Sequence, residues 1–328
     1  MKRIFARLFL ASALGVAAAA PLAPARAAGT AVTFGMSSWI GFAPLFVASS
    51  KKFFGDYPIK FVHMDTGINA ALISGAIDTA DISMNEAIND HVKGFPVKIV
   101  MPIDYSNGAD AIVATTSIAS VPDLRGRTIP LNTASYSELL LSYALHKAKL
   151  SLADVKQTDM PAADVPAALL GGHAKAGVTW APHISMITAH KKFHVLYTSA
   201  DAPGLITDNF AAKTGFLQAH PQAMPAIIKG FLKGSAYIKS HPAESYRIIG
   251  KTLGISPADA KAQYAQVINP TLPEMKYMMT GTGNYQIIPY KTNISMVRDL
   301  MITQKQLDKS QTVDWKSLLD PTYLDEVK

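Results

Sequence analysis

The chain has 328 residues, of which 49% are hydrophobic and 17% charged, and it contains no cysteine. This length is typical of two domains, and the lack of cysteine excludes disulfides, thiolate catalysis and Cys-ligated metal sites. The formal net charge is +7, but the basic residues form no cluster interleaved with aromatic side chains. We therefore expect no binding to nucleic acid.

The first 27 residues have the three-part pattern of a secretory signal peptide. Basic residues precede an apolar run over 8–20, and an A-x-A sequence ends at Ala27. The run has about 13 residues, whereas a helix that spans a membrane needs roughly 20. We expect cleavage before Ala28 and export to the periplasm. Because four basic residues and no acid lie in this segment, the remaining chain carries +3.

Short apolar stretches alternate with helical patterns through the first hundred residues. Strands are predicted over 31–39, 59–64, 79–84 and 97–105, with helices over 43–55, 69–76 and 85–94 between them. Such alternation favours an α/β fold in which helices flank a parallel sheet.

The alternation begins again after residue 110. Strands are predicted over 110–116, at the end of 120–131, and over 155–160, 174–180 and 193–199, with helices after Ser135 and over 163–172 and 181–192. From Asn209 onward the pattern is mostly helical, and its clearest helices cover 221–242, 243–254 and 293–307.

These two series predict two α/β lobes with a helical C-terminal tail. Residues 28–108 and 206–328 form the first lobe, and 109–205 form the second. Two crossings, near 104–110 and 200–210, would let the lobes close on each other like a jaw. Ligands of such sheets bind outside the carboxyl ends of parallel strands, so the candidate site residues are those that follow each strand.

Six stretches, in order along the chain, carry a family resemblance. They are SSWIGFAPLFVASSKKFF, GINAALISGAIDTADIS, GFPVKIVMPIDYSNGADAIVA, SVPDLRGRTI, ADVPAALLGGHAKAGVTWAP and APGLITDNFAA. Over residues 30–305 the chain resembles the periplasmic solute-binding proteins of nitrate/sulfonate/taurine-type ABC transporters. The resemblance implies a type II periplasmic binding protein fold, with a mostly parallel sheet flanked by helices in each lobe. It also implies a non-catalytic monomer without a cofactor, which delivers a small molecule to an inner-membrane permease and its ATPase.

One departure from the family pattern bears on the ligand. Many relatives have Trp-Glu-Pro where this chain has Trp180-Ala181-Pro182, followed by His183. A carboxylate common in the family is therefore missing here, and a relative's ligand does not transfer directly.

Polar and aromatic residues at the strand ends are the candidate ligand contacts. Trp39 and Trp180 each follow a strand and could form opposite walls of the cleft, although a tryptophan there can also cap the end of a sheet. Thr66 and Gly67 follow the second predicted strand, and the glycine permits close approach to the backbone. Ser83 and Asn85 follow the third, where Asn85 could instead serve as a helix N-cap.

The stretch after residue 131 combines a helix start with possible ligand donors. Ser135 and Glu138 have the spacing of a capping box, in which each side chain satisfies a backbone amide of the helix. The amides that remain, with side-chain donors from Thr133, Ser135 and Tyr136, could bind an anionic group. An anion at such a helix end gains roughly 0.3 to 1 kcal/mol.

The charged candidates point to different ligands. The helix end and His183 favour an anion, whereas Asp104 and Asp208 favour a cation or hydrogen-bond donor unless they brace the hinge. The sequence and the resemblance predict a sulfonate, taurine or nitrate-type anion or zwitterion, with a cationic, amine or pyrimidine-type solute as the alternative. An enzyme is less favoured, because no Ser/His/Asp order or G-x-S-x-G motif is evident. An enzyme of thiamine-precursor type is less favoured because its cysteine-rich motif has no counterpart in a chain without cysteine. The i, i+4 pair His190 and His194 falls across a strand start and predicts no metal site.

Overall fold

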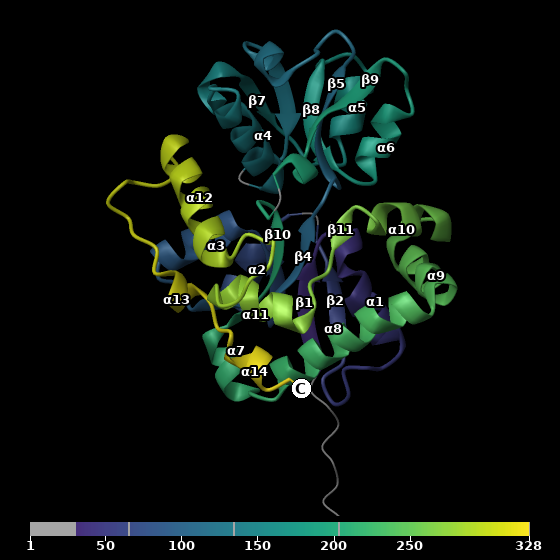
Figure 1. Ribbon diagram of the computed structural model, residues 1–328, viewed down its shortest axis with the longest axis vertical. Coiled ribbons are helices and arrows are strands. Elements are labelled where there is room, and N and C mark those ends of the chain that lie inside the picture. The colour runs from purple at the N-terminus through teal and green to yellow at the C-terminus, as the bar shows by residue number, and fades with distance from the viewer. Residues whose placement is uncertain (1–30, 65, 134, 203, 328) are drawn as a thin grey trace, which may run out of the picture.

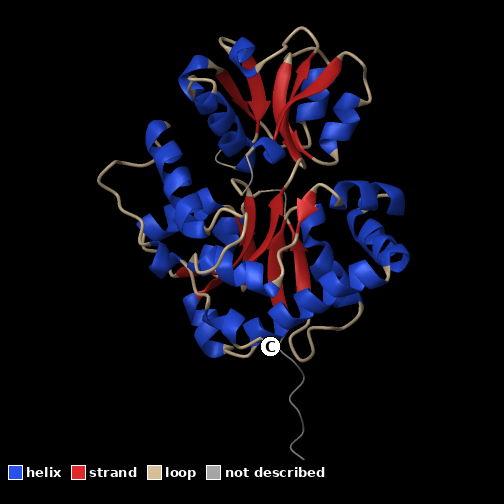
Figure 2. Cartoon of the chain, in the orientation of Figure 1, coloured by secondary structure: helices blue, strands red, loops and turns tan. Residues whose placement is uncertain are grey.

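The computed structural model describes residues 31–64, 66–133, 135–202 and 204–327 (Figure 1). The predicted signal peptide lies outside these residues. The described chain forms two parts, which we call the large lobe and the small lobe, and Figure 2 shows that strands in both are flanked by helices. Among the described residues, no helix has the length and hydropathy needed to cross a bilayer.

The large lobe is built on a six-stranded sheet. Its strand order is β11 (Val267–Ile268), β4 (Val97–Ser106), β10 (Thr207–Lys213), β3 (Thr79–Ile82), β1 (Val32–Met36) and β2 (Ile59–His63). Its helices from the first part of the chain are η1 (Ile40–Phe42), α1 (Ala43–Ser50), α2 (Ile68–Ser74) and α3 (Met84–Val92). Those after β10 are α7 (Thr214–Ala219), α8 (Ala223–Ser240), α9 (Pro242–Leu253), α10 (Pro257–Tyr264), α11 (Leu272–Thr280), α12 (Tyr290–Thr303), α13 (Trp315–Leu318) and α14 (Thr322–Asp325).

The small lobe contains two shorter sheets. One has the order β8 (Ala176–Trp180), β5 (Asp110–Thr115) and β9 (Phe193–Thr198), and the other pairs β6 (Thr128–Leu131) with β7 (Lys156–Asp159). Its helices are η2 (Val121–Leu124), α4 (Tyr136–Lys147), η3 (Leu152–Asp154), α5 (Val165–Leu170), α6 (His183–Thr188) and η4 (Ser199–Asp201).

The sheets are mixed, whereas the sequence predicts mostly parallel ones. Only the pairs β1–β2, β1–β3 and β6–β7 are parallel among the described strands. Strand β10 is antiparallel to both β3 and β4, because it carries the chain back from the small lobe beside the strand that carried it out. In the small lobe, β8 and β9 both run antiparallel to β5.

Aromatic side chains fill the core of the large lobe beside this returning strand. Phe34 of β1 stacks on Phe210 of β10 with ring centroids 4.8 Å apart, and it meets Phe42 edge to face at 5.7 Å. All three are fully buried. Such ring pairs contribute about 0.5 to 1.5 kcal/mol beyond the burial of their area, so they hold β10 firmly in the sheet.

Within the described residues, two chain crossings join the lobes. The first leads from β4 to β5, and the second returns through η4 to β10 (Figure 1). The hydroxyl of Ser199 holds the two together: it lies 2.7 Å from Ser106 Oγ and accepts a hydrogen bond of 2.7 Å from the amide of Gly108. It also accepts a longer one, of 3.4 Å, from the amide of Asp110.

Both helix starts that the sequence singles out differ in detail from the prediction. Helix α3 is capped by Ser83, in a capping box with Glu86, and Asn85 lies inside the first turn. Ser135 does cap α4, but its hydroxyl accepts from the amide of Ser137 rather than from that of Glu138. The Glu138 carboxylate accepts a hydrogen bond of 2.9 Å from Gln306 Nε2, just after α12.

Candidate functional site

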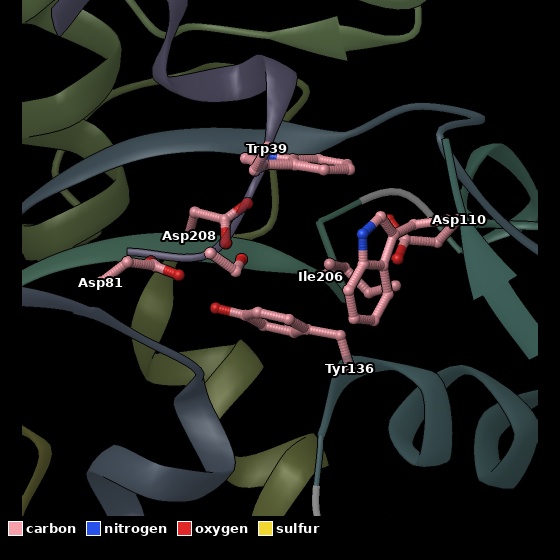
Figure 3. A pocket seen from close by; sticks show the side chains of 8 residues that line it. Trp39, Asp81, Asp110, Tyr136, Ile206 and Asp208 are labelled. Carbon is pink, nitrogen blue, oxygen red and sulfur yellow. The ribbon is translucent and has the colours of Figure 1, made fainter. Parts of the chain in front are cut away.

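A cleft between the two lobes contains two adjoining cavities. The first has a volume of about 40 Å³ and is lined by Ser37, Trp39, Asp81, Asp110, Tyr136, Trp180, Ile206 and Asp208 (Figure 3). The second has a volume of about 310 Å³ and is lined by Ser37, Thr66, Gly67, Ile68, Asp81, Ser83, Glu86, Asn132, Thr133, Ser135, Tyr136 and Trp180. Four residues line both, and each cavity takes residues from both lobes.

Trp39 forms one wall of the first cavity and is tied to a buried carboxylate. Its indole Nε1–H lies 3.1 and 3.3 Å from the two carboxylate oxygens of Asp104, which is itself fully buried. Gly41 leaves the space for this pair, because a Cβ added at Gly41 would lie 1.8 Å from Asp104 Oδ2. Asp104 therefore supports the wall from behind and does not line either cavity.

Tyr136 and Trp180 are contributed by the small lobe. Tyr136 opens α4, and its hydroxyl donates a hydrogen bond of 3.0 Å to the carbonyl oxygen of Thr207 at the start of β10. Figure 3 shows Trp39 and Tyr136 on opposite sides of the cavity, with Asp81 and Asp208 toward one end and Asp110 toward the other. Trp180 ends β8 and lines both cavities.

The register of the large sheet brings its acidic residues together. Asp208 of β10 is directly opposite Asp104 of β4, so the two side chains share a face. Asp81 of β3 lies on the other side of β10, where its Oδ1 accepts a hydrogen bond of 3.1 Å from the amide of Asn209.

Burial and mutual repulsion raise the pKa values of these carboxyl groups. For Asp81 and Asp104, burial is the largest cause and the charge of Asp208 the next, and the pKa of each lies well above its usual range. Burial raises the pKa of Asp208 to about 6, with hydrogen bonding opposing the shift. Burial also raises the pKa of Asp110 to about 7. Perturbed acids gathered in a cleft are typical of functional sites.

The second cavity is lined mainly by hydroxyl groups and helix starts. Thr133 donates to Asp159 Oδ1 through both its amide and its hydroxyl, at 2.9 and 2.8 Å. Gly67 precedes α2 with φ of +76°, a left-handed conformation that suits glycine. On the large-lobe side, Ser83 Oγ donates a hydrogen bond of 2.6 Å to Glu86 Oε2.

The structure brings nine of the twelve predicted site residues to the cleft. These are Trp39, Thr66, Gly67, Ser83, Thr133, Ser135, Tyr136, Trp180 and Asp208. Asp104 stands behind Trp39, and Asn85 is buried within α3. His183 lines neither cavity; its ring lies 6.4 Å from that of Trp180, and burial lowers its pKa. Whether the nine contact a ligand stays a prediction.

Sequence reasoning missed the acids Asp81, Asp110 and Glu86. Asp81 is flanked by the strand residues Ala80 and Ile82, and Asp110 begins an apolar strand directly after the first crossing. A carboxylate inside or at the end of a buried strand is costly without a partner, and that is the signal by which both could have been found. In the described residues, no group of His, Asp and Glu side chains is arranged to hold a metal ion.

Comparison with known proteins gives both sequence relatives and structural neighbours. The family model described as NMT1/THI5 like matches residues 39–245, which is more than half of the chain. A protein of Escherichia coli (strain K12) named for binding aliphatic sulfonates is 26% identical over 192 residues, covering 56% of this chain and 60% of that protein. A protein of Brucella abortus (strain 2308), named only as a binding protein, is 24% identical over 167 residues, covering 50% and 52%. The chain thus spans between half and two thirds of the length of these curated relatives.

Two solved structures show the same fold. The alkanesulfonate-binding protein SsuA of Xanthomonas axonopodis pv. citri, bound to MOPS, has a TM-score of 0.71 at 17% identity, covering 90% of this chain and 100% of its own. The nitrate-binding protein NrtA of Synechocystis PCC 6803 has a TM-score of 0.66 at 15% identity, covering 91% and 86%. The predicted periplasmic binding protein fold is confirmed, and the chain belongs to the NMT1/THI5-like family.

Proposed function

We propose that the protein is the substrate-binding component of an ABC importer. It captures one small polar molecule between a lobe of residues 28–108 and 206–328 and a lobe of 109–205. It then delivers the molecule to a permease and its ATPase. The observation that carries this proposal is the cleft itself, which has aromatic and polar residues from both lobes around two adjoining cavities.

The joint between the lobes supports a role that requires opening and closing. In the part of the chain that the structure describes, two crossings connect the lobes, and both meet at the hydroxyl of Ser199. Binding proteins of this architecture close by a hinge at a few such residues. The signal-peptide pattern of residues 1–27 supports action in the periplasm, and a monomer suffices because the cleft is complete within one chain.

Ligand binding is tested with Trp180→Ala and the control Trp315→Ala, which alters a tryptophan outside the cleft. In a thermal-shift screen and calorimetry, a ligand at 100 times its Kd should stabilise the wild type by about 2.7 kcal/mol. Trp180→Ala should weaken binding about tenfold or more, and Trp315→Ala should not. Equal binding by both variants would remove Trp180 from the site. Conversion of a ligand to product would favour the enzyme alternative instead.

For the identity of the ligand, one candidate is a sulfonate, taurine or nitrate-type anion or zwitterion. It is favoured by the names of the relatives and by the start of α4 at the second cavity, where backbone amides attract negative charge. The carboxylates of the same cleft disfavour a fully anionic ligand.

A further inference from the structure

The lining of the first cavity has a strongly biased chemistry. Three of its eight residues are aspartates and three are aromatic. Among the described residues that line either cavity, none is Lys, Arg or His, so nothing there offers a full positive charge to an anion. Glu86 adds a further acid to the second cavity.

Asp110 supplies an independent sign of a missing partner. Asp110 is 3% exposed and lines the cavity, and its Oδ2 has no hydrogen-bond partner among the described residues. A buried carboxylate oxygen without a partner is costly, because it has lost its water and gained nothing in return. A ligand group that donates hydrogen bonds or carries positive charge would remove that cost.

The large lobe also contributes aspartates to the first cavity, at the end opposite Asp110 (Figure 3). Asp208 and Asp104 face each other across paired strands, so two ionised carboxylates there would repel each other unless one is protonated or a cation lies nearby. Asp81 is close enough for its pKa to be raised by the charge of Asp208. A cation between Asp81, Asp208 and Asp110 would neutralise this field, as Figure 3 shows the three around one space.

The aromatic rings complete a site for a cationic group. Trp39 and Tyr136 lie on either side of the cavity, and Trp180 also lines it. The face of an aromatic ring attracts a cation, and this is worth about 2 kcal/mol or more where water is excluded. Because this cavity is only about 40 Å³, it suits the charged end of a ligand whose remainder occupies the second cavity.

We propose that the solute carries a positively charged nitrogen, which sits among Trp39, Tyr136 and Trp180 with Asp81, Asp110 and Asp208 as its counter-charges. This inference rests on the proposed function and narrows it to organic cations, such as protonated amines. A second, anionic group on the ligand would lie in the larger cavity.

The test is calorimetry with probes that share a carbon chain and differ in charge. Propylamine, homotaurine and propanesulfonate are compared within a wider panel of short amines, guanidine, aminopyrimidines, sulfonates and nitrate. We expect a cationic member to bind, and the amine of each matched set to bind tighter than its sulfonate. Asp110→Asn should lose about tenfold or more in affinity for the cation, because its shape is kept and its charge removed. Asp325→Asn, an exposed surface change, should lose nothing.

The outcomes separate the two proposals. If the sulfonates bind more tightly than the amines, or if Asp110→Asn binds the cation more tightly than the wild type, the proposed positive charge on the solute is wrong. Either result would still support capture of a solute in the cleft. If no member of the panel binds the folded wild-type protein, both proposals fail.

Discussion

Asp110 carries a cost in the folded protein that the proposed cationic ligand would remove. Its pKa in the folded protein is about 7 and its usual value is 3.8, so folding favours the protonated form. The stability that this preference provides is fully present below about pH 4 and is lost as the pH rises toward about 7. At neutral pH the ionised group therefore opposes folding.

We expect Asp110→Asn to stabilise the ligand-free protein near neutral pH. Each unit of pKa shift corresponds to about 1.4 kcal/mol, so the gain at about pH 7.5 should be on the order of 1 to 4 kcal/mol and should shrink toward about pH 5. Urea denaturation at both pH values measures it, with Asp325→Asn as the control. An equal effect at the two pH values would show that charge is not the cause.

Ligand binding should depend on pH in the sense set by the same acids. The groups facing the first cavity come from β3 (Asp81), β10 (Asp208), β5 (Asp110) and α4 (Tyr136), with Asp104 of β4 behind them. A cation should bind more weakly as the pH falls from about 7.5 to about 5.5, because Asp110 and Asp208 become protonated. An anion should show the opposite trend in calorimetric titrations.

At the scale of single elements, the N-cap of α3 links helix stability to the cleft wall. Ser83 caps the helix and also lines the second cavity, whereas Ser256 caps α10 on an exposed surface. Replacing either serine by alanine should cost about 0.5 to 2 kcal/mol of stability. Only Ser83→Ala should also lower ligand affinity, and chemical denaturation with calorimetry separates the two effects. Equal affinity in both variants would mean that Ser83 acts only as a cap.

Most elements could be predicted from the sequence, and the exceptions have a common physical cause. The strands and helices before residue 106 follow from apolar spacing and turn residues, as β1 and α1 illustrate. The sequence predicts a mostly helical region from Asn209 onward, where the structure has most of β10. The strand is missed because its residues are buried on both faces and show no alternation of apolar and polar side chains. Its antiparallel pairing with β4 depends on contacts far apart in the chain.

The candidate site could be predicted from the sequence only in outline. Trp39, Tyr136 and Trp180 could be found because each follows a predicted strand or opens a predicted helix. Asp81 and Asp110 leave only a weaker signal, a carboxylate in or at the end of an apolar strand, and their grouping depends on neighbours from other strands. Trp39, which the sequence predicts as a cleft wall or a cap on the sheet, is 6% exposed and bonded to Asp104, so Trp39→Ala should destabilise the fold as well as weaken the proposed ligand binding.

For the whole molecule, we expect ligand to bring the lobes closer together. Small-angle scattering should show a smaller radius of gyration for the wild type in saturating ligand than without it. At a ligand concentration near the wild-type Kd, Asp110→Asn should stay closer to the larger, ligand-free value, because a tenfold weaker Kd leaves it about a tenth occupied while the wild type is about half occupied. Identical curves with and without a ligand that calorimetry shows to be bound would contradict closure.

The placement of Asp110 has a consequence for how occupancy controls shape. Its amide donates to Ser199 at the joint between the lobes, and its carboxylate faces the cavity. In the proposed complex, a positive charge in the cavity would act directly on the residue at which the chain enters the small lobe. Under the proposed function, ligand recognition and lobe closure would then need no chain of intermediate side chains, and a permease that selects the closed form would indirectly select for the charge inside it.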